Sequence, residues 1–300
     1  PAVRPGPPKQ VAYAATAARA AVLGAASHLA HPDRSVASSR EPLSLVDTHL
    51  HLEELGQGAE IDAAIADAVA AGVTRLVTMG GDAASSRKAL ALAQSNPAVF
   101  AAAGHHAANH DDPDLPELRR LLSEPRTVAV GEVGLDGSPG ADYAPMDRQE
   151  AWFGQLCDLA VEHDLPVSVH VREAADQVLR IITARPGLRG VMHYFSLDWD
   201  WAQRFLEAGF HLSFAGVLTR PSRGELREVV RRCPADRLLL ETDSPYGLPH
   251  SRRRERANCP SFLVDTAAVV AELRGISLSA LAELEWTNAH EVFSRMPGPA

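Results

Sequence analysis

The segment LSLVDTHLH, residues 43–51, joins an apolar, β-branched run to two histidines at its end. This composition is typical of a buried β-strand that leads into a polar loop. Longer amphipathic stretches with the pattern of helices, such as 61–71, 148–163 and 222–232, separate it from similar runs. These further runs are TRLVTMG (74–80), VFAAAGHH (99–106), TVAVGEVG (127–134), PVSVHV (166–171), RGVMHYF (189–195), FHLSFAG (210–216) and RLLLETDSP (237–245). Strands that alternate with helices in this way indicate βαβ units and a parallel sheet.

The length and the polar residues favour a closed barrel. Eight strand–helix units within 300 − 42 = 258 residues match the usual size of a (β/α)₈ barrel, or TIM barrel. A doubly wound open sheet has the same alternation. In a barrel, however, catalytic groups gather where the strands end, and ionisable residues close six of the eight runs here. These residues are His49 and His51, His106, Glu132, His170, His193 and Asp243. We therefore predict a TIM-barrel domain over residues 43–300.

Most of these side chains have the chemistry of metal ligands. His49 and His51 are two residues apart on a strand, so they point to the same side. Such a pair alone is often accidental. With Glu132, His170, His193 and Asp243 it forms a set of four imidazoles and two carboxylates, suited to zinc, manganese or magnesium. Six ligands exceed the need of one tetrahedral ion, so we predict two divalent ions that share one carboxylate. Glu132 is the expected bridge, because its strand lies between the other ligands.

Bulk properties limit the classes of protein to consider. The formal net charge of −9 gives no general attraction to nucleic acid, so a polyanion needs a local basic patch. No apolar run approaches the roughly 18 residues of a membrane-spanning helix. The cysteines, Cys157, Cys233 and Cys259, are few and widely spaced, which fits free thiols in a reducing cytoplasm. We expect a cytoplasmic protein, and the sequence gives no sign of an obligate protein partner.

The first 42 residues differ in composition from the rest. Residues 1–10 are rich in proline, 11–30 are mostly alanine, and 31–42 are polar with turn formers. A signal peptide is one interpretation, because Arg4 and Lys9 precede the alanine-rich stretch. Arg19 interrupts that stretch, and alanine makes a weak hydrophobic region. We therefore predict an N-terminal extension that is helical or partly disordered.

Five strings of the sequence carry a family resemblance. They are VDTHLHL (46–52), GEVGLD (131–136), VSVHVREA (167–174), MHYFS (192–196) and LLLETDSPY (238–246). In this order they resemble the TatD family of metal-dependent deoxyribonucleases, over essentially all of residues 43–295. The resemblance implies an amidohydrolase-like barrel that cleaves DNA phosphodiester bonds by a metal-bound hydroxide. It also implies that one ion is held by His49, His51, Glu132 and Asp243, and the other by Glu132, His170 and His193.

Several loops depart from the family's pattern. Gly104-His105-His106-Ala107 lacks the usual proline, and Gly137-Ser138-Pro139-Gly140 replaces residues that are commonly aromatic. Phe195-Ser196-Leu197 occurs where the family usually has Phe-Ser-Gly, and Asn258-Cys259-Pro260 occurs where it usually has Asn-Glu-Pro. None of these changes a predicted ligand. They bear on the substrate rather than on the metal chemistry.

We expect substrate contacts from His106, Arg172, Arg256 and Asn258. Arg172 follows His170 by two residues and is matched in the family, and Arg256 belongs to a cluster with Arg252, Arg253 and Arg254. Arginine forks bind phosphate well, although a solvated loop paired with acids is the alternative for the cluster. Asp243 is the predicted general base. Two other functions stay open: a hydrolase for an amide, ester or lactone in a small molecule, and a barrel that binds without catalysis.

Overall fold

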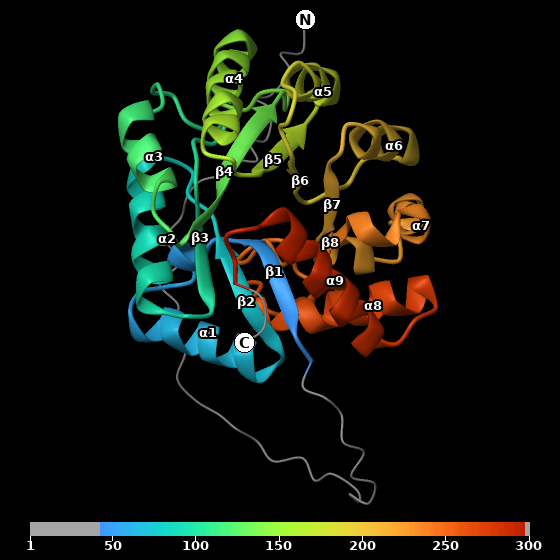
Figure 1. Cartoon of the computed structure of the whole chain (residues 1–300). Helices are drawn as coiled ribbons and strands as arrows, with labels where there is room; N and C mark the ends of the chain where they lie inside the picture. Colours follow the sequence, from blue (N-terminus) through green and yellow to red (C-terminus); the bar gives the residue numbers. More distant parts are fainter. Residues whose placement is uncertain (1–42, 298–300) are drawn as a thin grey trace, which may run out of the picture.

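The computed structural model describes residues 43–297, in which eight parallel strands stand inside a layer of helices (Figure 1). Each strand is hydrogen-bonded to the next in sequence order. The strands are β1 (Leu45–Leu50), β2 (Val73–Thr78), β3 (Val99–Ala103), β4 (Thr127–Asp136), β5 (Val167–Arg172), β6 (Gly190–Met192), β7 (His211–Phe214) and β8 (Leu238–Leu240). The predicted TIM barrel is confirmed. The extension predicted for residues 1–42 lies outside the described residues.

The ring closes just beyond the end of β8. The backbone N–H of Asp243 donates to the carbonyl of His49 at 2.9 Å, and that of His51 donates to the carbonyl of Ser244 at 2.8 Å. These bonds continue the parallel pairing between the last strand and β1. The open doubly wound sheet is therefore excluded.

Helices follow the strands and cover the outside of the ring. They are α1 (Ala59–Ala70), α2 (Ala83–Ser95), α3 (Leu115–Leu122), α4 (Met146–Glu162), α5 (Ala175–Thr183), α6 (Trp199–Glu207), α7 (Gly224–Arg232), α8 (Leu263–Arg274) and α9 (Leu278–Val292). Polar residues start several of them. At α2, for example, Asp82 accepts a hydrogen bond from the backbone N–H of Ser85 at 2.6 Å and so caps the helix. No helix in residues 43–297 is long and apolar enough to cross a membrane.

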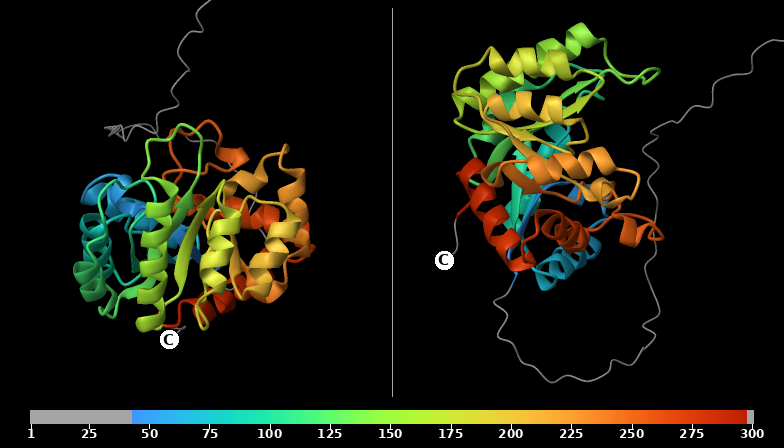
Figure 2. Two further views of the ribbon diagram at one scale, coloured as in Figure 1. Left: turned by 90° about the horizontal axis from the view of Figure 1, so that it is seen from above. Right: turned by 90° about the vertical axis from the view of Figure 1, so that its right-hand side faces the viewer.

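Alternating side chains of the strands build two apolar clusters. Leu45 and Leu76 point outward and pack with the surrounding helices, whereas Val46 and Val77 point into the barrel. Phe293 and Met296, at the end of α9, belong to the inner cluster and close the amino-terminal end of the barrel. At the opposite end of the barrel, the carboxyl ends of the strands lead into loops. Figure 2 shows the loops after β4 and β8 together on this side, away from the C-terminus.

Candidate metal centre

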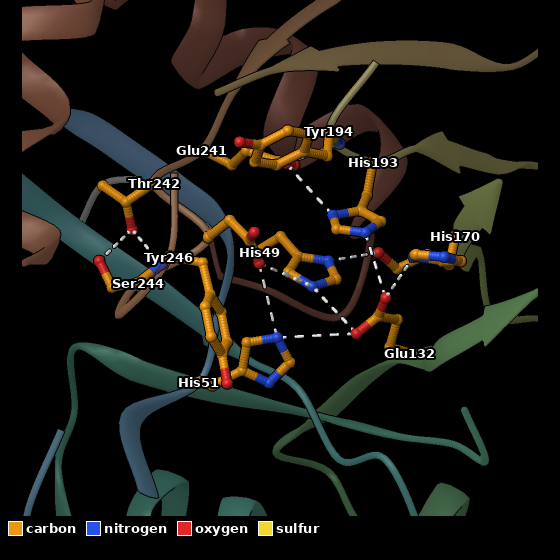
Figure 3. Close-up of polar contacts among 12 residues, drawn as sticks. His49, His51, Glu132, His170, His193, Tyr194, Glu241, Thr242, Ser244 and Tyr246 are labelled. Carbon is orange, nitrogen blue, oxygen red and sulfur yellow. Dashed lines mark hydrogen bonds and ion pairs between the residues drawn. The ribbon is translucent and has the colours of Figure 1, made fainter. Parts of the chain in front are cut away.

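Glu132 stands at the centre of the predicted ligands, inside β4 rather than at its end (Figure 3). Its Oε1 lies 3.1 Å from Nδ1 of His170 and 3.1 Å from Nε2 of His193. Its Oε2 lies 3.6 Å from Nε2 of both His49 and His51. The two oxygens of one carboxylate thus face two different pairs of imidazoles.

Asp243 completes the pair formed by His49 and His51. Its Oδ1 lies 3.6 Å from Nε2 of His51 and 3.9 Å from Nε2 of His49. The backbone at Asp243 has a φ of 57°, in the left-handed region that costs a non-glycine residue about 1–2 kcal/mol. The bond to the carbonyl of His49 and a 2.7 Å bond from the N–H of Tyr246 to the carbonyl of Asp243 hold this conformation. The strained turn keeps the carboxylate in the site.

A buried nitrogen of His49 without a hydrogen-bond partner among the described residues indicates that these side chains could bind a metal ion. Nδ1 of His49 is hydrogen-bonded to Oγ of Ser168 at 2.9 Å, but the buried Nε2 has no hydrogen-bond partner in residues 43–297. A tetrahedral ion with bonds of 2.0–2.2 Å places its ligand atoms about 3.3–3.6 Å apart. The distances among His49, His51, Glu132 and Asp243 are close to this spacing. The residues therefore fit a divalent ion.

Two further carboxylates orient the histidines on the other side of Glu132. Asp136 Oδ2 lies 3.1 Å from Nε2 of His170, and Glu241 Oε1 lies 3.2 Å from Nδ1 of His193. A ring that donates its N–H to a carboxylate presents the lone pair of its other nitrogen, the usual arrangement for a metal-ligating histidine. These lone pairs face Glu132. The geometry therefore suits a second divalent ion here.

Asp136, Glu241 and Ser168 were not among the predicted site residues. Asp136 lies four residues after Glu132 in one strand, and Glu241 lies two before Asp243. Residues separated by an even number of positions in an extended chain have their side chains on the same face. The spacing from Glu132 and from Asp243 could therefore have indicated Asp136 and Glu241. Ser168 is two residues before His170, and only the fold reveals that it contacts His49.

Burial and opposite charges set the ionisation of the cluster. Burial raises the pKa of Glu132, but the facing imidazoles of His106 and His193 outweigh it and lower the pKa well below its ordinary value. Burial lowers the pKa of His193, but Glu241 and Glu132 raise it well above its ordinary value. The pKa of Asp136 falls to about 2, because hydrogen bonds from His170 and Ser138 outweigh the effect of burial. The cluster thus holds carboxylates in the charged form that binds cations.

His106 approaches the same carboxylate in a different role. Its Nε2 lies 3.2 Å from Oε1 of Glu132, and His106, Glu132 and His170 together are a possible metal-binding group. However, Nδ1 of His106 accepts a hydrogen bond from the backbone N–H of Ala108 at 3.1 Å. A neutral ring whose Nδ1 accepts carries its proton on Nε2, so that nitrogen is a donor. This geometry suits His106 to donate to a bound group rather than to ligate metal.

Two residues in β1 and β4 hold the strands around the site. The buried Asp47 accepts a hydrogen bond from the backbone N–H of Thr242 at 2.9 Å, and this fixes the residue before Asp243. Gly134, beside His170 in the sheet, has a φ of 141°. A Cβ atom there would lie 2.0 Å from the carbonyl oxygen of His170, so only glycine permits this close approach of β4 and β5.

The remaining predicted substrate contacts differ in their exposure to solvent. Arg172 ends β5 and Arg256 lies in the loop after β8, and both are exposed with no guanidinium partner in residues 43–297. Asn258 is only 1% exposed. Its Nδ2 donates to the carbonyl of Thr242 at 2.8 Å, and its Oδ1 accepts from the N–H of Cys259 at 3.0 Å. The buried amide of Asn258 is thus occupied in holding the loop, and a substrate contact from this residue stays a prediction.

Comparisons with known proteins identify the family of this chain. The family model described as TatD related DNase matches residues 46–294. A relative from Erwinia billingiae, named 3'-5' ssDNA/RNA exonuclease TatD, is 35% identical over 263 residues, which cover 84% of this chain and 100% of that protein. The metal-dependent hydrolase YabD of Bacillus subtilis is 33% identical over 254 residues, 83% of this chain and 98% of that protein.

The fold of this chain is also similar to that of a solved TatD homologue. The crystal structure of YjjV, a TatD homologue from Escherichia coli, superimposes with a TM-score of 0.77 at 29% identity. The match covers 83% of this chain and 98% of that one. It agrees with the barrel fold. The chain belongs to the TatD-related DNase family and is a metal-dependent hydrolase.

Proposed function

We propose that this protein is a nuclease that hydrolyses phosphodiester bonds of DNA with the help of two divalent ions, zinc, magnesium or manganese. The observation that carries the proposal is the two-sided contact of Glu132 with two pairs of histidines. One shared carboxylate between two nitrogen-rich groups is the ligand pattern of a two-ion centre. The relatives named as exonucleases support a nucleic acid as the substrate.

In this proposal each ion would have its own set of ligands, and Glu132 would belong to both sets. His49, His51 and Asp243 would complete one set, and His170 and His193 would complete the other. When bound, divalent ions lower the pKa of a water molecule and neutralise phosphate charge. Asp136 and Glu241 keep their histidines in the tautomer that ligates.

Protein groups move the proton and orient the phosphate. An Asp243 carboxylate oxygen accepts the proton of the attacking water, and the water attacks phosphorus opposite the leaving oxygen. The Nε2–H of His106 donates to a phosphoryl oxygen. The guanidinium groups of Arg172 and Arg256, which have no partner in residues 43–297, neutralise charge that develops on the phosphate. Because Cys157, Cys233 and Cys259 are free thiols, we place the enzyme in the reducing cytoplasm.

The two alternative functions have weaker support. A barrel that only binds does not need six intact ligands, each placed within reach of a shared ion. A hydrolase for small amides or esters would use the same ions, but it gives no reason for unpaired arginines at the mouth.

One assay separates the three functions. The full-length protein is incubated with single-stranded DNA, with and without chelator, beside a panel of amides, esters and lactones. We expect DNA cleavage that chelator abolishes and added metal restores. Turnover of an amide or ester without any phosphodiester cleavage would overturn the nuclease assignment, and no turnover at all would favour a binding protein.

A further inference from the structure

Arginines at the barrel mouth differ from those elsewhere on the molecule. On the sides of the barrel they form ion pairs, as Arg119 does with Glu162 at 2.7 Å and Arg185 with Asp158 at 2.6 Å. Within residues 43–297, a few arginines have no side-chain hydrogen bond, ion pair or aromatic contact, and all are exposed. These are Arg172, Arg220, Arg223, Arg254 and Arg256. All of them lie at the end of β5 or in the loops after β7 and β8, on the side of the metal centre.

The loops after β7 and β8 form one continuous surface. The backbone N–H of His250 donates to Oγ1 of Thr219 at 2.7 Å, and Arg220 is the next residue. A Cβ atom on Gly216 would lie 2.3 Å from the carbonyl oxygen of Gly247, so the two loops touch backbone to backbone. The N–H of Arg223 donates to the carbonyl of Arg220 at 3.0 Å, which keeps both arginines in one turn. The two loops that carry these arginines are therefore adjacent.

This surface is basic, although the whole chain is acidic. Residues 216–224 contain two arginines and no acid, and residues 246–259 contain four arginines and one acid, Glu255. Of these arginines, Arg252 is paired with Asp265 at 2.6 Å. Exposed guanidinium groups without a carboxylate partner are the groups that bind phosphates. In a chain with a net charge of −9, their concentration beside the site needs a reason.

Tyr246 lies between this surface and the metal centre. Its side chain is 45% exposed, and its ring is 6.0 Å from that of His51 in an edge-to-face arrangement (Figure 3). Its hydroxyl donates to Glu54 at 2.5 Å, which fixes the ring. A fixed and exposed aromatic ring can stack an unpaired base, and proteins that bind single strands combine such rings with basic grooves.

We propose that the loops after β7 and β8 form a track for single-stranded nucleic acid, which holds the backbone on the far side of the phosphate being cleaved. Arg220, Arg223, Arg253 and Arg254 bind successive phosphates, and Tyr246 stacks the base beside the metal centre. The proposal rests on the proposed nuclease function and adds a preference for long strands. A dinucleotide reaches the metal centre but not the track.

The test compares a fluorescein-labelled dT20 with a dT dinucleotide, using the full chain with its metal. In the double variant Arg220→Gln/Arg223→Gln, we expect KM for dT20 to rise roughly tenfold and kcat to stay unchanged. The slope of log affinity against log salt should become shallower by about 1.4, the value for two lost contacts on a single strand. Cleavage of the dinucleotide should not change. Arg180→Gln/Arg204→Gln is the matched control, because it removes the same charge from α5 and α6 and should leave dT20 cleavage intact.

Binding of dT20 in chelator, measured by fluorescence anisotropy, tests the track without cleavage. A tenfold loss in the Arg220/Arg223 variant supports the track even for an enzyme with another reaction. Equal affinity of wild type and variant would overturn it, and so would equal losses for dT20 and the dinucleotide. Tighter binding of duplex DNA or of anionic lipid vesicles than of dT20 would also overturn it. Absence of cleavage of both substrates by the wild type contradicts only the proposed function.

Discussion

Glu241 offers a sharp test of the metal centre, because its carboxylate lies 3.2 Å from Nδ1 of His193, a proposed ligand. Its side chain is 0% exposed, and one oxygen accepts from both Nδ1 of His193 and the N–H of Tyr194, the latter at 2.7 Å. Glu241→Gln keeps the size of the side chain and removes its negative charge. The imidazole then loses a charge-assisted hydrogen bond and becomes a poorer ligand.

The expected effect is a 10- to 100-fold loss of metal affinity at the site of His193. This range is the usual effect of removing a residue that orients a metal ligand, and it corresponds to about 1.4–2.7 kcal/mol. Titration of the metal-free protein with zinc or manganese, in competition with a chelating dye, measures it. Only one of the two binding steps should weaken.

Glu285 provides the matched control at the opposite end of the barrel. It is also 0% exposed, and its Oε2 accepts from the N–H of Val46 at 2.9 Å, while Oε1 has no partner in residues 43–297. Burial raises the pKa of Glu285 well above its ordinary value, so glutamine resembles its neutral form. Glu285→Gln should leave both binding steps unchanged. Unaltered metal affinity in Glu241→Gln would refute the assignment of His193 as a ligand.

Three further predictions follow from the same geometry. Replacing the shared ligand in Glu132→Gln should lower metal content by more than one ion per chain, and full occupancy in elemental analysis would show that Glu132 does not bridge. Asp243→Asn should lower kcat on DNA by about 10²–10⁴-fold, the usual contribution of a general base; recovery with excess metal would reduce Asp243 to a ligand. His211 is 6% exposed, and burial, together with Arg237, lowers its pKa to about 4, below the unfolded value of 6.5. As the pH falls, His211 is protonated in the unfolded chain before it is protonated in the folded one. Its contribution to the free energy of unfolding is therefore complete above pH 6.5 and decreases toward pH 4, with a loss of about 2 kcal/mol at pH 5. In His211→Gln, urea unfolding at pH 7.5 and pH 5 should lack this loss, and an identical pH dependence in wild type and variant would contradict it.

Local patterns predicted the barrel and most of the side chains that the structure gathers around Glu132. Each strand carries its own signal, because buried parallel strands are continuous apolar runs, and the ligands follow those runs directly. The placement of His49 and His51 together needs only the two-residue period of a strand. Asp243 lies three residues beyond β8, yet the motif around it was sufficient to include it.

Contacts between distant segments were harder to predict. Ser168 contacts His49 across 119 residues, and Glu241 contacts His193 across 48, so their roles depend on which strands become neighbours. Asn258, in the loop after β8, was predicted as a substrate contact without any sign that it would be buried. Its burial depends on how that loop folds back on Thr242, which sequence periodicity does not encode.

The number of ions needed for activity tests the central claim most directly. Metal-free wild-type protein is titrated with manganese or zinc, and the initial rate of single-stranded DNA cleavage is measured at each ratio of metal to protein. A two-ion centre bridged by Glu132 predicts almost no activity without metal and a plateau at two equivalents. A plateau at one equivalent, or cleavage that persists in chelator, would contradict it.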